Sequence, residues 1–235
     1  MKILIIVIQY LPNSKTIAAK MLHELALELT KRNHSVTVVT PDHTLEADAK
    51  SGTIDGITVH YFKSGKVRKI NLARRAVNEL LLSFQAWRKL KHILKTEKCD
   101  FIIYYSPTIF FGLLVRKLKN IYRCPSFLVL RDLFPQWIID NGTISAFSPA
   151  AIYFKLFEKI NYRYADTIGL QSPANLEWFN AEHNRKSAKR TVLLYNWASN
   201  SRIFPNGSFR AKYSLEDKTL YFYGGNIGYA QDMMN

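Results

Sequence analysis

The sequence predicts an α/β fold, a parallel sheet with helices on both faces. Short runs rich in β-branched and aromatic residues alternate with stretches of helical periodicity along most of the 235 residues. The stretches between these runs are about 10 to 25 residues long, which is typical of crossover helices between parallel strands. The first run, residues 3–8, is continuously apolar, as expected of a strand buried on both faces.

The next elements follow from local pattern. A helix is predicted at 17–32, where leucines and Met21 recur at spacings of three and four, and Asn33 suits the left-handed conformation that ends a helix. The second strand, 36–40, ends at Pro41.

The alternation continues after a turn that is flanked by Gly52 and Gly56. The further strands are predicted at 57–62, 100–105, 126–130, 167–171 and 192–195. The helices between them are predicted at 70–95, 108–120, 147–164 and 174–182.

The pattern lapses between 197 and 218, where Pro205, Asn206 and Gly207 indicate a linker. A strand at 219–223 then leads into Gly224-Gly225-Asn226-Ile227-Gly228, as at the start of a phosphate-binding βα loop. The sequence thus predicts a domain at 1–196, a linker at 197–218 and, at 219–235, the first strand and glycine-rich loop of an incomplete second domain.

The net charge of +15 favours an anionic partner. Residues 63–98 hold eleven Lys and Arg but only Glu79 and Glu97 as acids, which makes +9. The helix at 70–95 would also have one apolar stripe, formed by Ala73, Val77, Leu80, Phe84, Trp87, Leu90 and Leu94. The basic face either binds an anionic membrane or is an ordinary solvated helix face, and these two interpretations are compatible. Nucleic acid is disfavoured because no binding motif accompanies the charge.

Other classes of site find little support. Cys99 and Cys124 are the only cysteines and form no CxxC, so a disulfide scaffold and a zinc site are disfavoured and core packing is expected. The six histidines are scattered and form no HExxH. The apolar run at 3–8 and the longest uncharged run, 101–115, are both too short to span a bilayer, which predicts a soluble or peripheral protein.

Ligands of such sheets bind at the carboxyl ends of the strands, so the loops that follow the strands hold the candidate site residues. For each candidate an ordinary structural role is the alternative: a turn cap for Asp132, a pair with Asp132 for Arg131, and loop or turn roles for the others. Trp137 and Trp197 are expected to pack in the core, with stacking on a sugar or lipid as the alternative. The candidates are Tyr10, Lys15, Arg131, Asp132, Ser172, Asn196, Gly225, Asn226 and Gly228.

An ordered set of short segments resembles the retaining GT-B glycosyltransferases of family 4. The likeness is greatest to bacterial O-antigen and capsule enzymes, among them the L-fucosamine (N-acetyl-L-fucosamine) transferases. The segments are Gln9-Tyr10-Leu11-Pro12, Arg131-Asp132-Leu133-Phe134-Pro135, Ala165-Asp166-Thr167-Ile168 with Ser172, Tyr195-Asn196, and Gly225-Asn226-Ile227-Gly228 with Ala230-Gln231.

The resemblance implies a Rossmann-like N-terminal domain that binds a lipid-diphosphate-linked saccharide, and a second domain that binds a nucleotide-sugar, expected to be UDP-linked. It implies a reaction without metal or another cofactor, at the inner face of the cytoplasmic membrane. Asp132 would contact the acceptor hydroxyl or the transferred sugar, while Tyr10, Lys15, Arg131, Ser172 and Asn196 would bind substrate.

The same resemblance assigns the donor diphosphate to Gly225, Asn226 and Gly228. The chain departs from the family pattern at two places. Ser14, Lys15 and Thr16 stand where glycines are usual, and the neutral Asn226 and Gln231 replace an arginine and a lysine.

Two functions remain open. The first is a glycosyltransferase of O-antigen or capsular polysaccharide synthesis, of which the chain holds the acceptor domain and the start of the donor domain. The alternative is a non-catalytic acceptor- or membrane-binding subunit that needs a separate donor-domain chain. A nucleotide-dependent oxidoreductase is disfavoured because GxGxxG is absent after the first strand.

Overall fold

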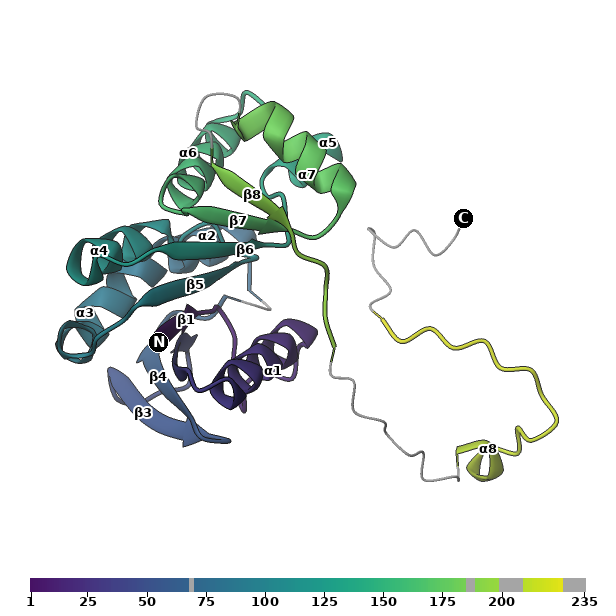
Figure 1. The fold of residues 1–235 in the computed structure, drawn as a ribbon. Coiled ribbons are helices and arrows are strands. Elements are labelled where there is room, and N and C mark those ends of the chain that lie inside the picture. Colours follow the sequence, from purple (N-terminus) through teal and green to yellow (C-terminus); the bar gives the residue numbers. More distant parts are fainter. Residues whose placement is uncertain (68–69, 185–188, 199–208, 226–235) are drawn as a thin grey trace. The chain divides into compact units, whose positions relative to one another are not determined.

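A computed structural model describes residues 1–67, 70–184, 189–198 and 209–225 (Figure 1). The chain divides into two compact units, Met1–Ala198 and Ser199–Asn235. The first unit contains the sheet and the helices that cover it. In the second, the described residues form one short helix, α8 (Phe209–Lys212).

The first unit is built on a sheet of eight strands in the order β3-β4-β2-β1-β5-β6-β7-β8. All neighbouring strands are parallel except β3 and β4, which confirms the predicted α/β fold. Starting from β1, the chain builds one side of the sheet and then crosses to β5 to build the other. The strands are β1 (Lys2–Ile6), β2 (Ser35–Asp42), β3 (Ala49–Ile54), β4 (Ile57–Lys63), β5 (Phe101–Ser106), β6 (Ser126–Leu130), β7 (Thr167–Leu170) and β8 (Arg190–Leu193).

The antiparallel edge strand β3 is an addition to the predicted sheet. Gly52 lies inside this strand rather than beside a turn. The turn itself is Asp55-Gly56, where both residues have positive φ, as a tight hairpin turn requires. The sequence pattern missed β3 because most of its side chains are polar and exposed, which is common at a sheet edge.

Within the described residues, seven α-helices accompany the sheet, and two of them replace the single helix predicted at 70–95. Leu81 separates α2 from α3 and belongs to neither. The helices are α1 (Ile17–Lys31), α2 (Leu72–Leu80), α3 (Leu82–Thr96), α4 (Gly112–Tyr122), α5 (Gln136–Asp140), α6 (Pro149–Arg163) and α7 (Pro173–Phe179), and a π-helical turn, η1 (Asn180–Asn184), follows α7.

The break at Leu81 changes which residues are buried. Val77 and Phe84 belong to the predicted apolar stripe, yet they are 54% and 62% exposed. Leu90 and Leu94 of the stripe are buried in α3, together with Leu82, Ser83 and Ala86. The predicted stripe is therefore confirmed only in part, because its later members pack in the core while Val77 and Phe84 face solvent.

Each face of the sheet has its own core. On one face, α1 packs through Met21, Leu22 and Ala26 against side chains such as Ile5 and Val38. On the other face, buried side chains of α3 and α4 join Tyr162 of α6 and Phe179 of α7 (Figure 1). Trp197, predicted to begin the linker, belongs to the α1 core and donates a hydrogen bond to the Met21 carbonyl at 3.0 Å.

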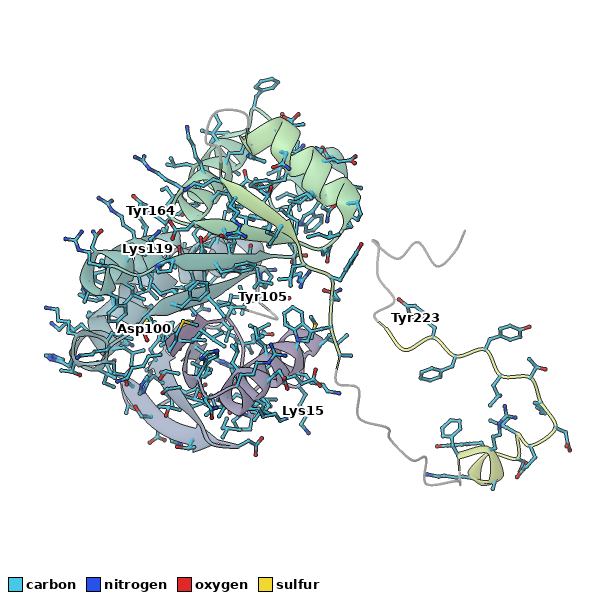
Figure 2. The ribbon with its side chains drawn as sticks, viewed as in Figure 1. Lys15, Asp100, Tyr105, Lys119, Tyr164 and Tyr223 are labelled. Atoms are coloured by element: carbon cyan, nitrogen blue, oxygen red, sulfur yellow. The ribbon has the colours of Figure 1, made fainter. Side chains whose placement is uncertain are left out.

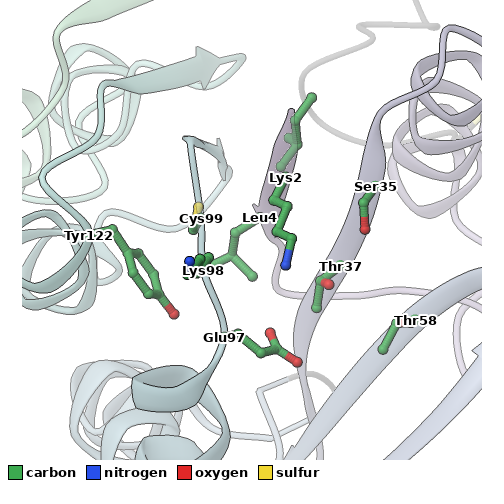
Figure 3. Close-up of a pocket in the computed structure, with 10 residues that line it drawn as sticks. Lys2, Leu4, Ser35, Thr37, Thr58, Glu97, Lys98, Cys99 and Tyr122 are labelled. Carbon is green, nitrogen blue, oxygen red and sulfur yellow. The ribbon is translucent and has the colours of Figure 1, made fainter.

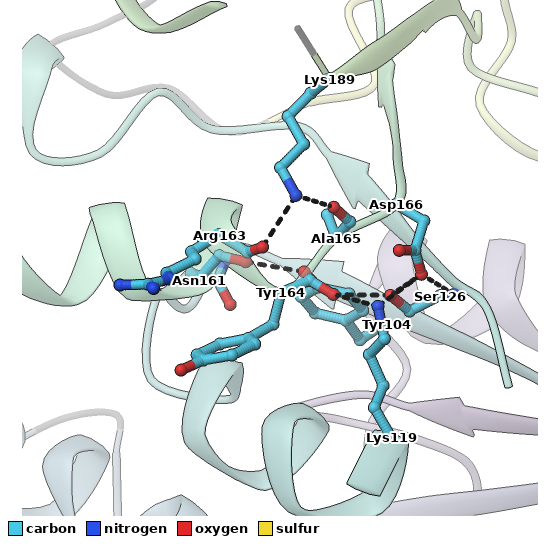
Figure 4. A network of polar contacts seen from close by, with 9 residues as sticks. All are labelled: Tyr104, Lys119, Ser126, Asn161, Arg163, Tyr164, Ala165, Asp166 and Lys189. Atoms are coloured by element: carbon cyan, nitrogen blue, oxygen red, sulfur yellow. Dashed lines mark hydrogen bonds and ion pairs between the residues drawn. The ribbon is translucent and has the colours of Figure 1, made fainter. Parts of the chain in front are cut away.

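A polar network holds the end of α6 against the amino ends of β5 to β7 (Figure 4). Asp166 accepts hydrogen bonds from the backbone N–H of Ser126 at 2.7 Å and from Lys119 Nζ at 2.5 Å. The Tyr104 hydroxyl, which is buried, donates to the Asn161 carbonyl at 2.7 Å. These bonds fix the last turns of α6, while its first turns reach the opposite edge of the sheet.

The predicted strand at 219–223 is not formed within the described part of the second unit. A strand needs a partner for its N–H and C=O groups, and residues 209–225 contain no other strand. Tyr221, Phe222 and Gly225 are exposed. Asn226 and Gly228, predicted to bind donor phosphate, lie outside the described residues.

Candidate functional site

A cavity of about 640 Å³ lies at the carboxyl edge of the sheet. It is lined by Ile8 and Gln9 after β1, Pro107 after β5 and Asp132 after β6. The chain reverses its direction of sheet building between β1 and β5, and ligands of open α/β sheets bind at such a switch point. This cavity is therefore the candidate site.

Aromatic and aliphatic side chains form most of the cavity wall. Phe134 and Phe154 meet edge to face with ring centroids 4.9 Å apart. Trp137, on α5, also lines the cavity and is 52% exposed, so the core packing expected for it was wrong. Such a wall suits an apolar group or the face of a sugar ring.

The polar side of the cavity comes from α2 and the loop after β6. Arg75 Nε lies 2.6 Å from Glu79 Oε1, and Thr108 donates a hydrogen bond to Glu79 Oε2 at 3.4 Å. Glu79 is buried, so its charge is compensated by Arg75. Among the lining residues that the structure describes, the charged side chains are those of Arg75, Glu79 and Asp132. This described part of the lining therefore offers a diphosphate one cation, which is already paired with Glu79.

Asp132 is the predicted site residue that lines the cavity. Although the residue is exposed to solvent, protein atoms around its carboxyl group raise its pKa above the ordinary value. Its side chain makes no hydrogen bond or ion pair within the described residues, and α5 begins without a side-chain cap. The alternative of a turn cap is thus absent, and the carboxylate is free to accept a hydrogen bond.

Arg131 has a structural role that neither of its predicted alternatives anticipated. It is buried, its guanidinium donates to the Leu194 carbonyl and, at 3.2 Å, to the Tyr195 carbonyl, and it stacks on Trp197. Burial lowers its pKa. The side chain ties the segment after β8 to β6 and does not line the cavity.

The candidates in the first loop lie outside the cavity lining. Tyr10 is buried, and its hydroxyl lies 2.8 Å from His23 Nδ1. Burial raises the pKa of Tyr10 well above the ordinary value. Lys15 is exposed beside α1 (Figure 2). Tyr10 thus packs in the core, and a substrate role for Lys15 stays a prediction.

The two remaining candidates lie on the β7–β8 side of the sheet. Ser172 caps α7, because its hydroxyl accepts a hydrogen bond from the Asn175 N–H at 3.2 Å. Asn196 is exposed after β8. Neither Ser172 nor Asn196 lines the cavity. Asp132 therefore lines the cavity, whereas the five candidates for substrate binding, Tyr10, Lys15, Arg131, Ser172 and Asn196, do not.

Apart from Asp132 and Trp137, the sequence did not single out the side chains that line the cavity. Phe110, Phe134 and Phe154 come from separate segments that meet only in the folded chain. One signal was available for Glu79, since it is one of only two acids in the basic stretch at 63–98. A lone acid among bases suggests a buried, paired carboxylate.

A second, smaller cavity of about 210 Å³ lies at the opposite, amino edge of the sheet (Figure 3). Lys2, Ser35 and Cys99 contribute to its wall, as does Glu97, whose carboxylate lies 2.9 Å from His60 Nε2. Burial raises the pKa of the Cys99 thiol to about 12, so the thiol stays protonated. Both cysteines are buried free thiols, which confirms the predicted core packing. The position at the amino edge does not favour this cavity as the site.

None of the described helices is long and apolar enough to cross a bilayer. Over the same residues, no group of three or more His, Cys, Asp or Glu is placed to hold a metal ion. The metal-free reaction stays a prediction.

The fold is similar to that of solved glycosyltransferases. Phytolacca americana UGT2 is 11% identical with a TM-score of 0.54, over 85% of this chain and 53% of its own. The catalytic domain of starch synthase IV from Arabidopsis thaliana, bound to ADP and acarbose, is 12% identical with a TM-score of 0.56, over 83% and 51%. Sucrose-phosphate synthase from Thermosynechococcus elongatus is 13% identical with a TM-score of 0.52, over 85% and 91%.

This chain therefore spans about half the length of the first two of these structures. Its mostly parallel sheet with helices matches the Rossmann-like N-terminal domain of GT-B glycosyltransferases. No curated protein sequence matches the chain. The sequence profile of Glycosyltransferase Family 4 matches residues 18–198. Because that match covers most of the 235 residues, the chain belongs to glycosyltransferase family 4.

Proposed function

We propose that the chain provides the acceptor domain of a retaining glycosyltransferase of O-antigen or capsular polysaccharide synthesis. The sugar, proposed to be N-acetyl-L-fucosamine from a UDP-linked donor, is transferred without metal to a lipid-diphosphate-linked saccharide. The observation that supports acceptor binding most directly is the cavity at the switch point, where the free carboxylate of Asp132 lies beside an aromatic wall.

In this proposal Asp132 accepts a hydrogen bond from the hydroxyl of the acceptor sugar and orients it for transfer. Its raised pKa makes it a somewhat stronger base than an ordinary aspartate, which strengthens that bond. Phe134, Phe154 and Trp137 pack on the sugar face or on the first apolar units of the lipid.

The diphosphates of donor and acceptor are proposed to lie outside the cavity, because the described part of its lining has more carboxylates than cations. Lys15 is exposed on the first loop and is one of the candidates predicted from the sequence. We propose that its ammonium group contacts one of these diphosphates. Gly225, Asn226 and Gly228 remain the proposed donor phosphate loop.

The same proposal places the protein in the cytoplasm, at the inner face of the membrane. A lipid-linked acceptor is embedded in a bilayer, and the basic region at 63–98 suits anionic lipid headgroups.

The acceptor role is tested by calorimetric titration of the 235-residue chain with a short prenyl diphosphate, with and without an attached saccharide. Asp132→Asn should weaken binding of the saccharide-bearing ligand about tenfold or more and leave the bare prenyl diphosphate unaffected. Asp140→Asn, an exposed acid on α5, is the matched control. Equal affinities of the Asp132 variant and the native chain would overturn the assignment.

The alternative, a subunit that works with a separate donor-domain chain, is favoured by one observation. Tyr221 and Phe222, in a β-rich run, are exposed and form no strand within the described residues. Turnover of UDP-sugar by the chain alone would contradict this alternative, whereas turnover only after addition of a donor-domain chain would support it.

A further inference from the structure

We propose that six exposed apolar side chains around the α2–α3 break and on α4 and α6 insert into an anionic bilayer. We call this set the apolar collar. Its members are Val77, Leu81, Phe84, Leu113, Ile152 and Leu156. The proposal goes beyond the basic region at 63–98, because it adds α4 and α6 and assigns insertion to apolar side chains.

Contacts between the helices place the members of the collar near one another. The Ser83 hydroxyl donates to the Phe110 carbonyl and accepts from the Leu114 N–H at 3.1 Å, so α3 and α4 meet beside Phe84 and Leu113. Gly112 packs on the last turns of α6, where a Cβ would lie 2.7 Å from Asn161 Cα, so α4 and α6 are also in direct contact.

The first turns of α6 are joined to the same surface by aromatic contacts. The Phe110 ring lies 5.0 Å from that of Phe157 and 6.4 Å from that of Tyr153. Ile152 and Leu156 each precede one of these aromatic residues and are exposed. The collar therefore follows the amino-terminal turns of α3, α4 and α6.

The charges on these helices are almost all positive. The helices α2, α3, α4 and α6 contain twelve Lys and Arg but only two acids, Glu79 and Glu158, and both acids are buried. Within one turn of collar residues lie Arg74, Arg88, Arg116, Lys117, Lys155 and Lys159. No carboxylate on these four helices is therefore exposed to repel an anionic headgroup.

This combination fits a bilayer better than the other anionic partners. Apolar side chains interleaved with Lys and Arg are typical of a protein surface that enters the lipid headgroup region. There the Lys and Arg side chains bind lipid phosphate, and the apolar side chains reach the acyl chains. A nucleic acid would bind the Lys and Arg side chains through its phosphates. It would leave Phe84 and Ile152, each 62% exposed, without an apolar partner.

The collar borders the candidate site. α2 lines the cavity through Arg75, Ala76 and Glu79, and α6 lines it through Ala150 and Phe154. Insertion of the collar would bring the cavity to the membrane surface. A lipid-linked acceptor could then enter the cavity while its tail stays in the bilayer, a consequence that rests on the proposed function.

Vesicle co-sedimentation of the full chain tests the proposal, with phosphatidylcholine vesicles that contain or lack phosphatidylglycerol. The double variant Phe84→Ser/Ile152→Ser should weaken binding to the anionic vesicles roughly tenfold or more. Ile17→Ser is the matched control, since Ile17 is 75% exposed on α1, on the other face of the sheet. All substituted side chains are exposed, and circular dichroism checks that each variant folds.

Insertion itself is measured with Phe84→Trp and lipids brominated on their acyl chains. The added tryptophan emission should be quenched, and raised salt should weaken binding without abolishing the quenching at high lipid concentration. Unquenched emission, or equal loss of binding in the double variant and in Ile17→Ser, would overturn the proposal. So would a vesicle-independent dimer that the double variant dissociates, because the collar would then be a protein interface.

The outcome is separable from that of the proposed function. Quenching with no saccharide-dependent binding would support the membrane surface and contradict the acceptor site. Saccharide-dependent binding without quenching would have the opposite meaning.

Discussion

The two faces of the sheet differ in how their helices meet solvent. On one face, α1 is close to charge balance, and its exposed bases form ion pairs such as Lys20–Glu24 and Lys31–Glu28 within the helix. On the other face, α3 and α4 contain no acid at all, and apolar side chains remain exposed between their bases.

This difference shows where much of the net charge of +15 lies, because α2, α3, α4 and α6 together carry twelve Lys and Arg but only two acids. A protein that needed charge only for solubility could spread it over both faces. Exposed apolar residues are common singly, whereas contiguous exposed apolar patches are typical of interaction surfaces, which is why we propose that the apolar collar binds a membrane. The same side of the sheet also contributes α2 and α6 to the cavity wall.

Among substitutions that test this difference between the two faces, Gly112→Val is expected to lower the free energy of unfolding most. Gly112 is the point at which α4 touches α6, and a Cβ would meet the Asn161 backbone at 2.7 Å. The helices would have to separate, so we expect a loss of about 3 kcal/mol or more in the free energy of unfolding, measured by urea denaturation. Gly52→Ala, at a position with open space, should change it little. Equal stability of both variants would show that the helix contact is not tight.

A pH-dependent effect on the same side is expected from Glu158→Gln. Burial raises the pKa of Glu158 from its ordinary value to about 7, although Tyr162 donates a hydrogen bond to it at 3.0 Å. The unfolded chain therefore loses this proton at lower pH than the folded chain, and the folded state is penalised increasingly as pH rises from about 4.5 to about 7.

Glutamine stays neutral and can keep the bond to Tyr162. The variant should match the native chain near pH 4 and be more stable at pH 8, by on the order of 3 kcal/mol. Urea denaturation across this pH range measures the difference. A difference that is constant with pH would contradict the buried, protonated state of Glu158.

The smallest effect is expected on the α1 face, from Tyr10→Phe. The variant loses the 2.8 Å hydrogen bond to His23 Nδ1 but keeps the aromatic packing, so about 1 kcal/mol of folding stability should be lost. Since Tyr10 does not line the cavity, affinity for the saccharide-bearing prenyl diphosphate should not change. A loss of affinity larger than the loss of stability would restore the substrate role predicted from the sequence.

The strands were predictable because buried parallel strands have continuous apolar runs, as in β1 and β5. β3 was missed because an edge strand needs few apolar residues, and α5 because five residues show little periodicity. The helix break at Leu81 has no glycine or proline to signal it, so the exposure of Val77 and Phe84 on either side of the break was not expected.

The site was predictable only in part, for a physical reason. Asp132 follows β6 at the carboxyl edge of the sheet, and the apolar run of that strand identifies such a position from local sequence. The aromatic wall and the Arg75–Glu79 pair come from α2, α5 and α6, which meet only through tertiary packing. Trp137 was assigned to the core because large aromatic side chains usually pack there.

The central claim, that the cavity at the switch point binds the acceptor, is tested most directly by a crystal structure of the chain with a saccharide-bearing prenyl diphosphate. The account predicts a sugar hydroxyl within hydrogen-bond distance of the Asp132 carboxylate and apolar carbons against Phe134 and Phe154. Binding of the saccharide at the amino edge of the sheet, in the cavity beside Glu97 and Cys99, would contradict it.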